Sequence, residues 1–184
     1  MKKKQKRMSR EDRREQILAA AIDVFVDKGY NGATTLEIAK AAEISEVTLF
    51  RHFKSKKEIF TSSIQPIIFT TLKESITASE NLNPEEQLKY ILTERIKLVA
   101  ENRKVMRLMI MESQINPELA EVSYIDKISG LLQATISDLG FSFDNDDFTM
   151  RILMGAILSF LYLPEDKEEN IGAFVEKLLI LIQK

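Results

Sequence analysis

The 184-residue sequence contains no cysteine, one histidine, six glycines and four prolines. Without cysteine, disulfides and thiolate chemistry are excluded, and we expect a reducing compartment. A single histidine and no cysteine supply few of the usual ligands of a metal site, so we expect no metal and no cofactor. Glycine and proline are absent from long stretches, and no convincing period-two strand is present. The sequence therefore predicts an all-α fold of about nine helices.

Signatures of catalysis and of membrane insertion are also missing. We find no glycine-rich phosphate loop, no Ser-His-Asp candidate and no recognisable pair of spaced carboxylates, which argues against an enzyme. The basic N-terminus is not followed by the apolar core of a signal peptide. The most apolar run, residues 150–163, is short for a membrane span and contains Arg151. We expect a cytoplasmic protein without a membrane partner.

The charges that are present are unevenly distributed, although the formal net charge is only -2. Residues 1–60 hold 14 Lys and Arg against 9 Asp and Glu, whereas residues 61–184 hold 12 against 19. Cations are concentrated in the segment ISEVTLFRHFKSKKEIF at 44–60, which also holds the histidine. Residues 1–60 are therefore basic and residues 61–184 acidic, which suggests that the N-terminal part binds a polyanion.

Helix-capping signals are dense in the first 60 residues. Ser9 can cap a first helix that Gly29 ends. That helix has an apolar stripe made of Ile17, Ala20, Ala21, Val24 and Phe25. The pattern T-T-L-E at 34–37 is a capping box for a second helix that extends to about residue 42. Ser45 can cap a third helix of about seven residues.

The later helices are expected to be longer. A capping box S-K-K-E at 55–58 begins a fourth helix that runs towards residue 79 and bends at Pro66, because proline has no N–H. Asn83-Pro84-Glu85 begins a fifth helix, and a sixth covers 104–113. Asn116-Pro117-Glu118 is expected to begin a seventh helix. An eighth opens at 144–147, and a ninth covers about 168–183.

Two short helices joined by a three-residue turn can form a helix-turn-helix, whose second helix enters the DNA major groove. Ala39 is small where the two helices must approach, and apolar contacts are available from Ile38, Ala42, Ile44 and Leu49. Hydroxyls at helix starts can meet phosphates, as Thr34 and Ser45 would. The first turn of the third helix directs residues 46–48 towards base edges, and Lys56 lies ready for the flanking backbone.

The run from Ile17 to Phe60 resembles the DNA-binding domain of the TetR family of bacterial transcriptional regulators. The matching motifs are ILAAA…F…KGY, T-T-x-x-I-A-x-A-A and S-x-x-T-L-[YF]-x-H-F-x-[ST]-K-x-x-[LI]-F. The resemblance implies a homodimer that binds a palindromic operator, usually represses, and leaves the double-stranded DNA when a small molecule binds. It also implies an arm at 1–9, a DNA-binding domain at 10–57 and a ligand-binding and dimerisation domain at 58–184.

The DNA-contacting residues that we expect combine this resemblance with the position of Arg51 at the end of the third helix. They are Thr34, Ser45, Glu46, Val47, Thr48, Phe50, Arg51, His52 and Lys56. The chain departs from the usual family pattern at Glu43, Glu46, Val47 and Phe50. Glu43 replaces a common turn glycine, which predicts a less tight or slightly strained turn. The departures at Glu46, Val47 and Phe50 leave the base preference of the third helix open.

Several alternatives stay open at this point. His52 can be a partly buried residue without a ligand, and Phe50 can pack in the core instead of facing DNA. The basic N-terminal residues can form a DNA-contacting arm or a solubilising tail. An alternative function is a helical interaction protein that keeps the fold but has weak or lost operator binding.

Apolar residues of the C-terminal helices exceed what one core needs, which predicts a dimer interface. Its expected residues are Gly155, Ala156, Ser159, Phe174, Leu178 and Leu181. Adaptable methionine and aromatic side chains are candidate walls of an effector pocket. These candidates are Phe69, Leu72, Tyr90, Met106, Met109 and Tyr124. Ordinary packing within one subunit explains either set as well.

Overall fold

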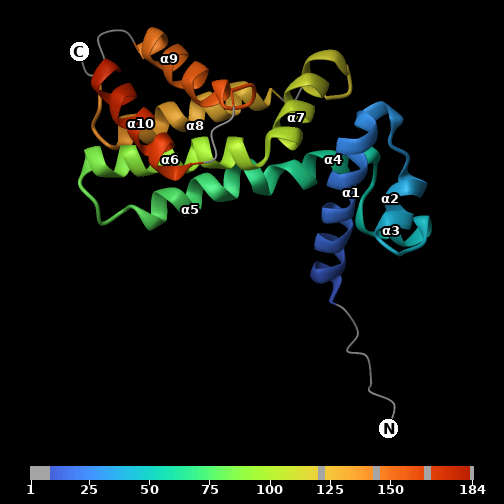
Figure 1. Cartoon of the computed structure of the whole chain (residues 1–184). Coiled ribbons are helices and arrows are strands. Elements are labelled where there is room, and N and C mark those ends of the chain that lie inside the picture. Colours follow the sequence, from blue (N-terminus) through green and yellow to red (C-terminus); the bar gives the residue numbers. More distant parts are fainter. Residues whose placement is uncertain (1–8, 120–122, 143–145, 164–166, 183–184) are drawn as a thin grey trace. The chain divides into compact units, whose positions relative to one another are not determined.

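The computed structural model describes residues 9–119, 123–142, 146–163 and 167–182, and every regular element in these ranges is a helix (Figure 1). The predicted all-α fold class is confirmed. The chain divides into two compact units, one ending at Gln65 and the other beginning at Pro66. Most of the predicted arm, residues 1–8, lies outside the described residues, as do residues 144 and 145 of the predicted eighth-helix opening.

From residue 9 onwards, unit 1 contains four helices: α1 (Arg10–Gly32), α2 (Thr35–Ala41), α3 (Glu46–His52) and α4 (Lys56–Gln65). At the start of α1, the Asp12 N–H donates to the Ser9 hydroxyl at 3.0 Å, and the Ser9 N–H donates to the Asp12 carboxylate at 3.1 Å. Gly29 has φ 70° and interrupts the helical geometry of α1. This is the residue at which the sequence predicts the end of the first helix. A positive φ is the conformation that glycine tolerates best.

The core of unit 1 is built around three aromatic rings from α1 and α4. The ring centroids of Phe25 and Phe60 lie 5.0 Å apart, and those of Tyr30 and Phe60 lie 5.2 Å apart, both in edge-to-face contact. Ile38 of α2 and Leu49 of α3 are fully buried as well. In the predicted stripe of α1, Ile17, Ala21 and Phe25 are buried, whereas Ala20 and Val24 are only partly covered.

The turn between α2 and α3 closes through two backbone hydrogen bonds. The Glu43 N–H donates to the Lys40 carbonyl at 3.0 Å, and the Ile44 N–H donates to the Ala39 carbonyl at 2.9 Å. This is the Schellman arrangement, in which the residue after the helix cap adopts a left-handed conformation. Glu43 occupies that position with φ 53°. The strain expected from a non-glycine residue in this turn is therefore present.

Unit 2 begins with a π-helical turn, η1 (Pro66–Thr70), which joins α4 to α5 (Thr71–Ala78) without a break. The bend predicted at Pro66 takes this form, since proline leaves one carbonyl of the preceding turn without its usual donor. The remaining helices are α6 (Pro84–Glu101), α7 (Arg103–Ile115), α8 (Tyr124–Asp138), α9 (Asp146–Ser159) and α10 (Glu168–Ile182).

Helix α6 is the centre of unit 2, in contact with α5, α7, α9 and α10 (Figure 1). Its buried face contains Leu88, Ile91, Leu92, Ile96 and Val99 at helical spacing. Salt bridges from Lys89 to Glu176 and from Lys97 to Glu168 join α6 to α10 at the surface. Among the described residues, no helix combines the length and apolar character needed to cross a membrane.

One predicted helix start is wrong. Asn116-Pro117-Glu118 does not begin a helix, and α8 instead begins at Tyr124 with Ser123 as its cap. The Asn116 side-chain oxygen accepts from the Glu118 N–H at 3.1 Å, and the Asn116 carbonyl accepts from the Leu119 N–H at 2.9 Å. These bonds make a tight turn that places Leu119 in the core, where it is completely buried.

The left-handed Glu43 makes a direct prediction about stability. A side chain in this conformation costs about 1–2 kcal/mol, of which the extra chain entropy of glycine cancels a part. We expect Glu43→Gly to raise the free energy of unfolding by about 0.5–1 kcal/mol, measured from the urea midpoint followed by circular dichroism. Glu43→Ala keeps the β-carbon and should show no comparable gain. Equal effects of the two substitutions would contradict the strain at this turn.

Candidate nucleic-acid interface

Helix α3 has only seven residues, too few to be stable alone, so its position depends on its cap and its packing. The Ser45 hydroxyl accepts from the Thr48 N–H at 3.2 Å and shares a hydrogen bond of 2.9 Å with the Thr48 hydroxyl. Leu49 and Phe53 anchor the opposite side in the core. These contacts fix which face of α3 points outwards.

The outward face of α3 presents Val47, Phe50 and Arg51. Val47 is 66% exposed and Phe50 is 49% exposed. The alternative that Phe50 packs in the core of unit 1 is therefore not supported. Apolar side chains on an otherwise polar surface can contact thymine methyl groups.

Glu46, in the first turn of α3, is held by the neighbouring helix. The Thr35 hydroxyl of α2 donates to the Glu46 carboxylate at 2.5 Å, and Glu46 is half-buried. A cytosine amino group would have to share this carboxylate with Thr35. The contact also links α2 to the start of α3, which the sequence pattern did not indicate.

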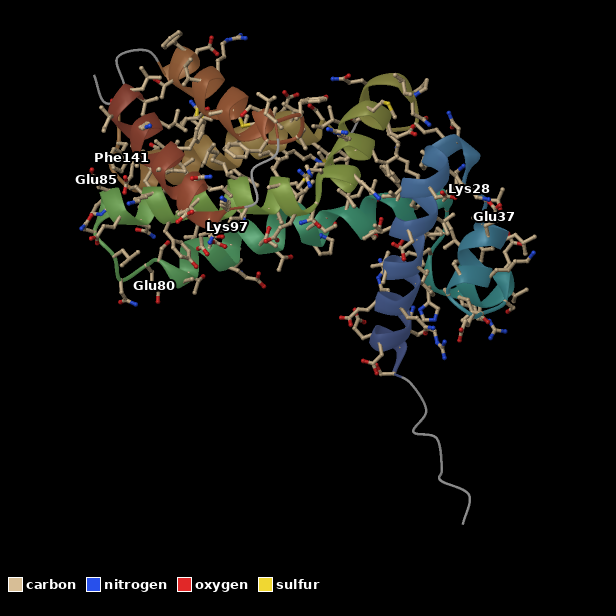
Figure 2. The ribbon with its side chains drawn as sticks, in the orientation of Figure 1. Lys28, Glu37, Glu80, Glu85, Lys97 and Phe141 are labelled. Carbon is tan, nitrogen blue, oxygen red and sulfur yellow. The ribbon has the colours of Figure 1, made fainter. Side chains whose placement is uncertain are left out.

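Thr34 forms the predicted capping box at the start of α2. Its hydroxyl accepts from the Glu37 N–H at 3.2 Å and donates to the Glu37 carboxylate at 2.9 Å. The same carboxylate pairs with Lys28 of α1 (Figure 2). The hydrogen bond from Lys28 and those from Thr34 lower the pKa of Glu37 to about 2. The single hydroxyl proton of Thr34 already has an acceptor, so a phosphate would have to displace Glu37.

Lys56 bonds to the end of α1. Its ammonium donates to the Tyr30 carbonyl at 2.9 Å and to the Ala33 carbonyl at 3.1 Å, and it lies 4.5 Å from the centroid of the Tyr30 ring. Two of its three donors thus join α4 to α1. Lys56 therefore links α4 to α1, and its third N–H remains as a donor for a DNA phosphate.

Arginines of the first turns of α1 lie near the end of α3, a feature that the sequence reading missed. Arg14 donates to the His52 carbonyl at 2.9 Å and to the Ser62 hydroxyl at 3.2 Å, and it stacks 4.1 Å from the centroid of the Phe53 ring. Burial, followed by the positive charges of three α1 arginines, lowers the pKa of the half-buried His52. The basic region around His52 is therefore made by two helices. The periodicity of α1 alone could have placed Arg10 and Arg14 on one face.

Eight of the nine predicted DNA-contacting residues fall into two groups, and the half-buried His52 belongs to neither. Val47, Phe50 and Arg51 are exposed on α3. The side chains that already serve internal hydrogen bonds are Thr34, Ser45, Glu46, Thr48 and Lys56. Among the described residues, no group of three or more His, Asp or Glu side chains could hold a metal ion.

Unit 2 contains an apolar cavity of about 50 Å³ between α5, α6, α7, α8, α9 and η1. Three of the predicted ligand-contacting residues line it: Leu72, Met106 and Met109. Phe69 and Tyr124 are not part of its wall, and Tyr90 instead lines a more open and polar depression beside α5 and α6. Burial raises the pKa of Tyr124 to about 12. Arg95 and Leu98 border both spaces.

The residues predicted for a dimer interface differ in exposure. Gly155, Phe174 and Leu181 are exposed, Ala156 and Ser159 are half-buried, and Leu178 is buried within this chain. Leu178 therefore offers little surface to a second subunit. Other exposed apolar residues on or after these two helices are Phe148, Tyr162, Leu163 and Ile180.

The capped α3, supported by α1, α2 and α4, defines unit 1 as a helix-turn-helix module of DNA-binding regulators. The family model for bacterial regulatory proteins of the tetR family matches residues 17–62. Over 91% of this chain and 96% of the other, a solved structure of a proposed fatty acid metabolism regulator from Clostridium perfringens is 32% identical, with a TM-score of 0.65. The chain belongs to the TetR family, and it is a DNA-binding transcriptional regulator.

Two curated relatives are also transcriptional regulators. The negative regulator IcaR of the biofilm operon icaADBC in Staphylococcus aureus is 28% identical over 170 residues, which is 89% of each chain. The activator FasR of Mycolicibacterium smegmatis is 46% identical over 59 residues, which is 32% of this chain and 27% of FasR. The second match thus covers only a part of each chain.

The internal bonds of Lys56 make a prediction that separates its two roles. Replacing it in Lys56→Met removes two charge-assisted hydrogen bonds to α1, so we expect a loss of about 1–3 kcal/mol in the free energy of unfolding. The exposed Lys54 is the matched control, and Lys54→Met should change stability by less than about 0.5 kcal/mol. Urea unfolding of both variants measures the difference. Unchanged stability in Lys56→Met would show that the bonds to Tyr30 and Ala33 contribute nothing.

Proposed function

We propose that this protein is a homodimeric repressor that binds a palindromic operator through α3 and releases it when a small molecule binds to unit 2. The observation that carries the DNA-binding part is the outward face of α3. Val47, Phe50 and Arg51 are exposed there, while Ser45 caps the helix and Leu49 anchors it. A rigid helix with such a face is what major-groove reading requires.

Repression, as opposed to activation, is proposed because IcaR, which is similar over 89% of both chains, is named as a negative transcriptional regulator. The domain roles follow the predicted division, with an arm at 1–9, DNA binding at 10–57, and ligand binding and dimerisation at 58–184. The apolar cavity supports the ligand role, since adaptable methionine side chains line it. The exposed apolar residues of α9 and α10 support the dimer.

Release of DNA would follow from the continuity of α4, η1 and α5. Lys56 begins α4 in the DNA-binding unit, and Leu72 of α5 lines the cavity. A ligand that favours one arrangement of this continuous segment would change the separation of the two α3 helices in a dimer. Half-sites lie about 34–36 Å apart, or a multiple of this, so a small change in separation weakens binding.

DNA binding is tested with fragments that the purified protein selects from a random duplex pool. About four phosphate contacts per subunit give a slope of log K against log salt of about -7. Arg51→Ala should reduce the magnitude of this slope by about 1 per subunit, and Thr48→Ala should cost about 1–3 kcal/mol for the selected sequence. Fluorescence anisotropy at several salt concentrations measures both.

Lys73→Ala is the matched control for these variants, because Lys73 is an exposed cation on α5, outside the DNA-binding unit. Its affinity and salt slope should equal those of the unchanged protein. Failure to enrich any duplex even at low salt would reject the regulator and favour the alternative, a helical interaction protein that has lost operator binding. The departures at Glu43, Glu46 and Phe50 are the observations that favour this alternative.

The dimer is tested on α10. Leu181 is 63% exposed, and Leu181→Glu places a charge on the apolar surface formed with Phe174 and Ile180. We expect this variant to sediment as a monomer at micromolar concentration, whereas the unchanged protein sediments as a dimer. Lys73→Glu, which changes an exposed lysine of α5 outside α9 and α10, is the control and should remain dimeric. A monomeric unchanged protein would refute the interface.

A further inference from the structure

Unit 2 buries an arginine on the central helix α6. Arg95 is only 8% exposed. Its Nη1 donates to the Ile68 carbonyl at 3.3 Å and to the Thr71 hydroxyl at 3.0 Å, and its Nη2 donates to the Ser75 hydroxyl at 3.1 Å. All three acceptors are neutral. The guanidinium is therefore solvated by the protein without being neutralised.

No carboxylate in the described part of the chain forms an ion pair with Arg95. Burial lowers the pKa of Arg95 to about 10, partly opposed by the more distant charges of Glu94 and Glu74, so the side chain remains a cation at neutral pH. Its Nε is buried and has no acceptor among the described residues. A buried cation of this kind is unfavourable unless an anion compensates it.

The geometry of the side chain indicates which anion would fit. Nε and one N–H of Nη2 lie on the same edge of a guanidinium and form a fork that matches the two oxygens of a carboxylate. The hydrogen bonds of Nη1 and Nη2 leave Nε without an acceptor. A carboxylate could therefore bind without first removing a partner from Nε.

The wall of the cavity indicates what would accompany the carboxylate. Among the described residues that line it, Arg95 is the only charged one, and the others are aliphatic side chains or methionines. The cavity of about 50 Å³ is small, but Met106, Met109 and Met154 come from two helices and can change rotamer to enlarge it. A neutral apolar ligand would leave the arginine unbalanced, and a polyanion would meet an apolar wall.

We propose that Arg95 binds the carboxylate of an amphipathic monocarboxylic acid whose apolar chain occupies this cavity. This inference names the class of the small molecule in the proposed function, and it rests on that function for its regulatory meaning. The carboxylate would share Nη2 with the Ser75 hydroxyl of α5, on the guanidinium whose Nη1 bonds to Ile68 and Thr71. Because these three acceptors lie on η1 and α5, binding acts on the segment that continues from α4.

The test uses the full chain without DNA and two probes that share one chain length. Isothermal titration with sodium decanoate should show binding, and decanol should bind roughly 10- to 100-fold more weakly, because it lacks the charge that pairs with Arg95. Equal affinities for decanoate and decanol would overturn the proposal. So would the absence of decanoate binding up to its solubility limit.

Variants test whether the carboxylate of decanoate binds Arg95. Arg95→Met should weaken decanoate binding roughly 10- to 100-fold and leave decanol binding nearly unchanged. Arg151→Met is the matched control, because Arg151 is an exposed arginine on α9, and it should bind decanoate as the unchanged protein does. Unchanged decanoate binding in Arg95→Met would overturn the proposal. If Arg95→Met does not fold, Arg95→Lys serves instead, and the comparison of decanoate with decanol decides without any variant.

The failure of this inference and the failure of the proposed function give different results. Decanoate that binds through Arg95 but leaves the selected duplex bound supports the site and refutes release by this ligand. A duplex that another small molecule releases, with no decanoate binding, refutes the inference and supports the proposed function.

Discussion

The whole of unit 1 depends on a length constraint: α2 and α3 have seven residues each, and helices of that length do not persist by themselves. Their order is imposed by hydroxyl caps at Thr34 and Ser45 and by an apolar core supplied largely by α1 and α4. The edge-to-face contacts of Phe60 with Phe25 and Tyr30 hold these two longer helices together. The exposed surface of α3, through which we propose that the protein binds DNA, is consequently a property of the entire unit and not of α3 alone.

The features that the sequence predicted correctly are local. Ser9, Thr34 and Ser45 cap the helices expected of them because each bond joins residues three apart. The contacts that it missed join distant positions, such as Arg14 with the His52 carbonyl and Lys56 with the Tyr30 carbonyl. Helix-starting patterns do not encode such partners, so the divided roles of the predicted DNA-contacting residues required the structure.

Two copies of one motif show where local signals stop being sufficient. Asn-Pro-Glu at 83–85 begins α6, where the Asn83 side chain accepts from the N–H three residues later. The same three residue types at 116–118 form a turn, where the Asn116 side chain accepts from the N–H two residues later. The second copy differs from the first in being followed by Leu119, whose side chain is fully buried in the core. Packing decided between two outcomes that the motif alone permits.

The π-helical turn at Pro66–Thr70 has a consequence for variation in chain length. A π turn accommodates one residue more than the α turn that it replaces, and each residue of an α-helix advances the side-chain direction by about 100°. The direction of Ile68, buried in η1, relative to that of Leu72 and Ser75, buried on α5, is therefore set by this additional residue. Surface loops absorb insertions and deletions, but a single deletion between Ile68 and Leu72 would rotate Ile68 away from the face that the other two share. In this part of the chain, residue count is as strictly specified as residue type.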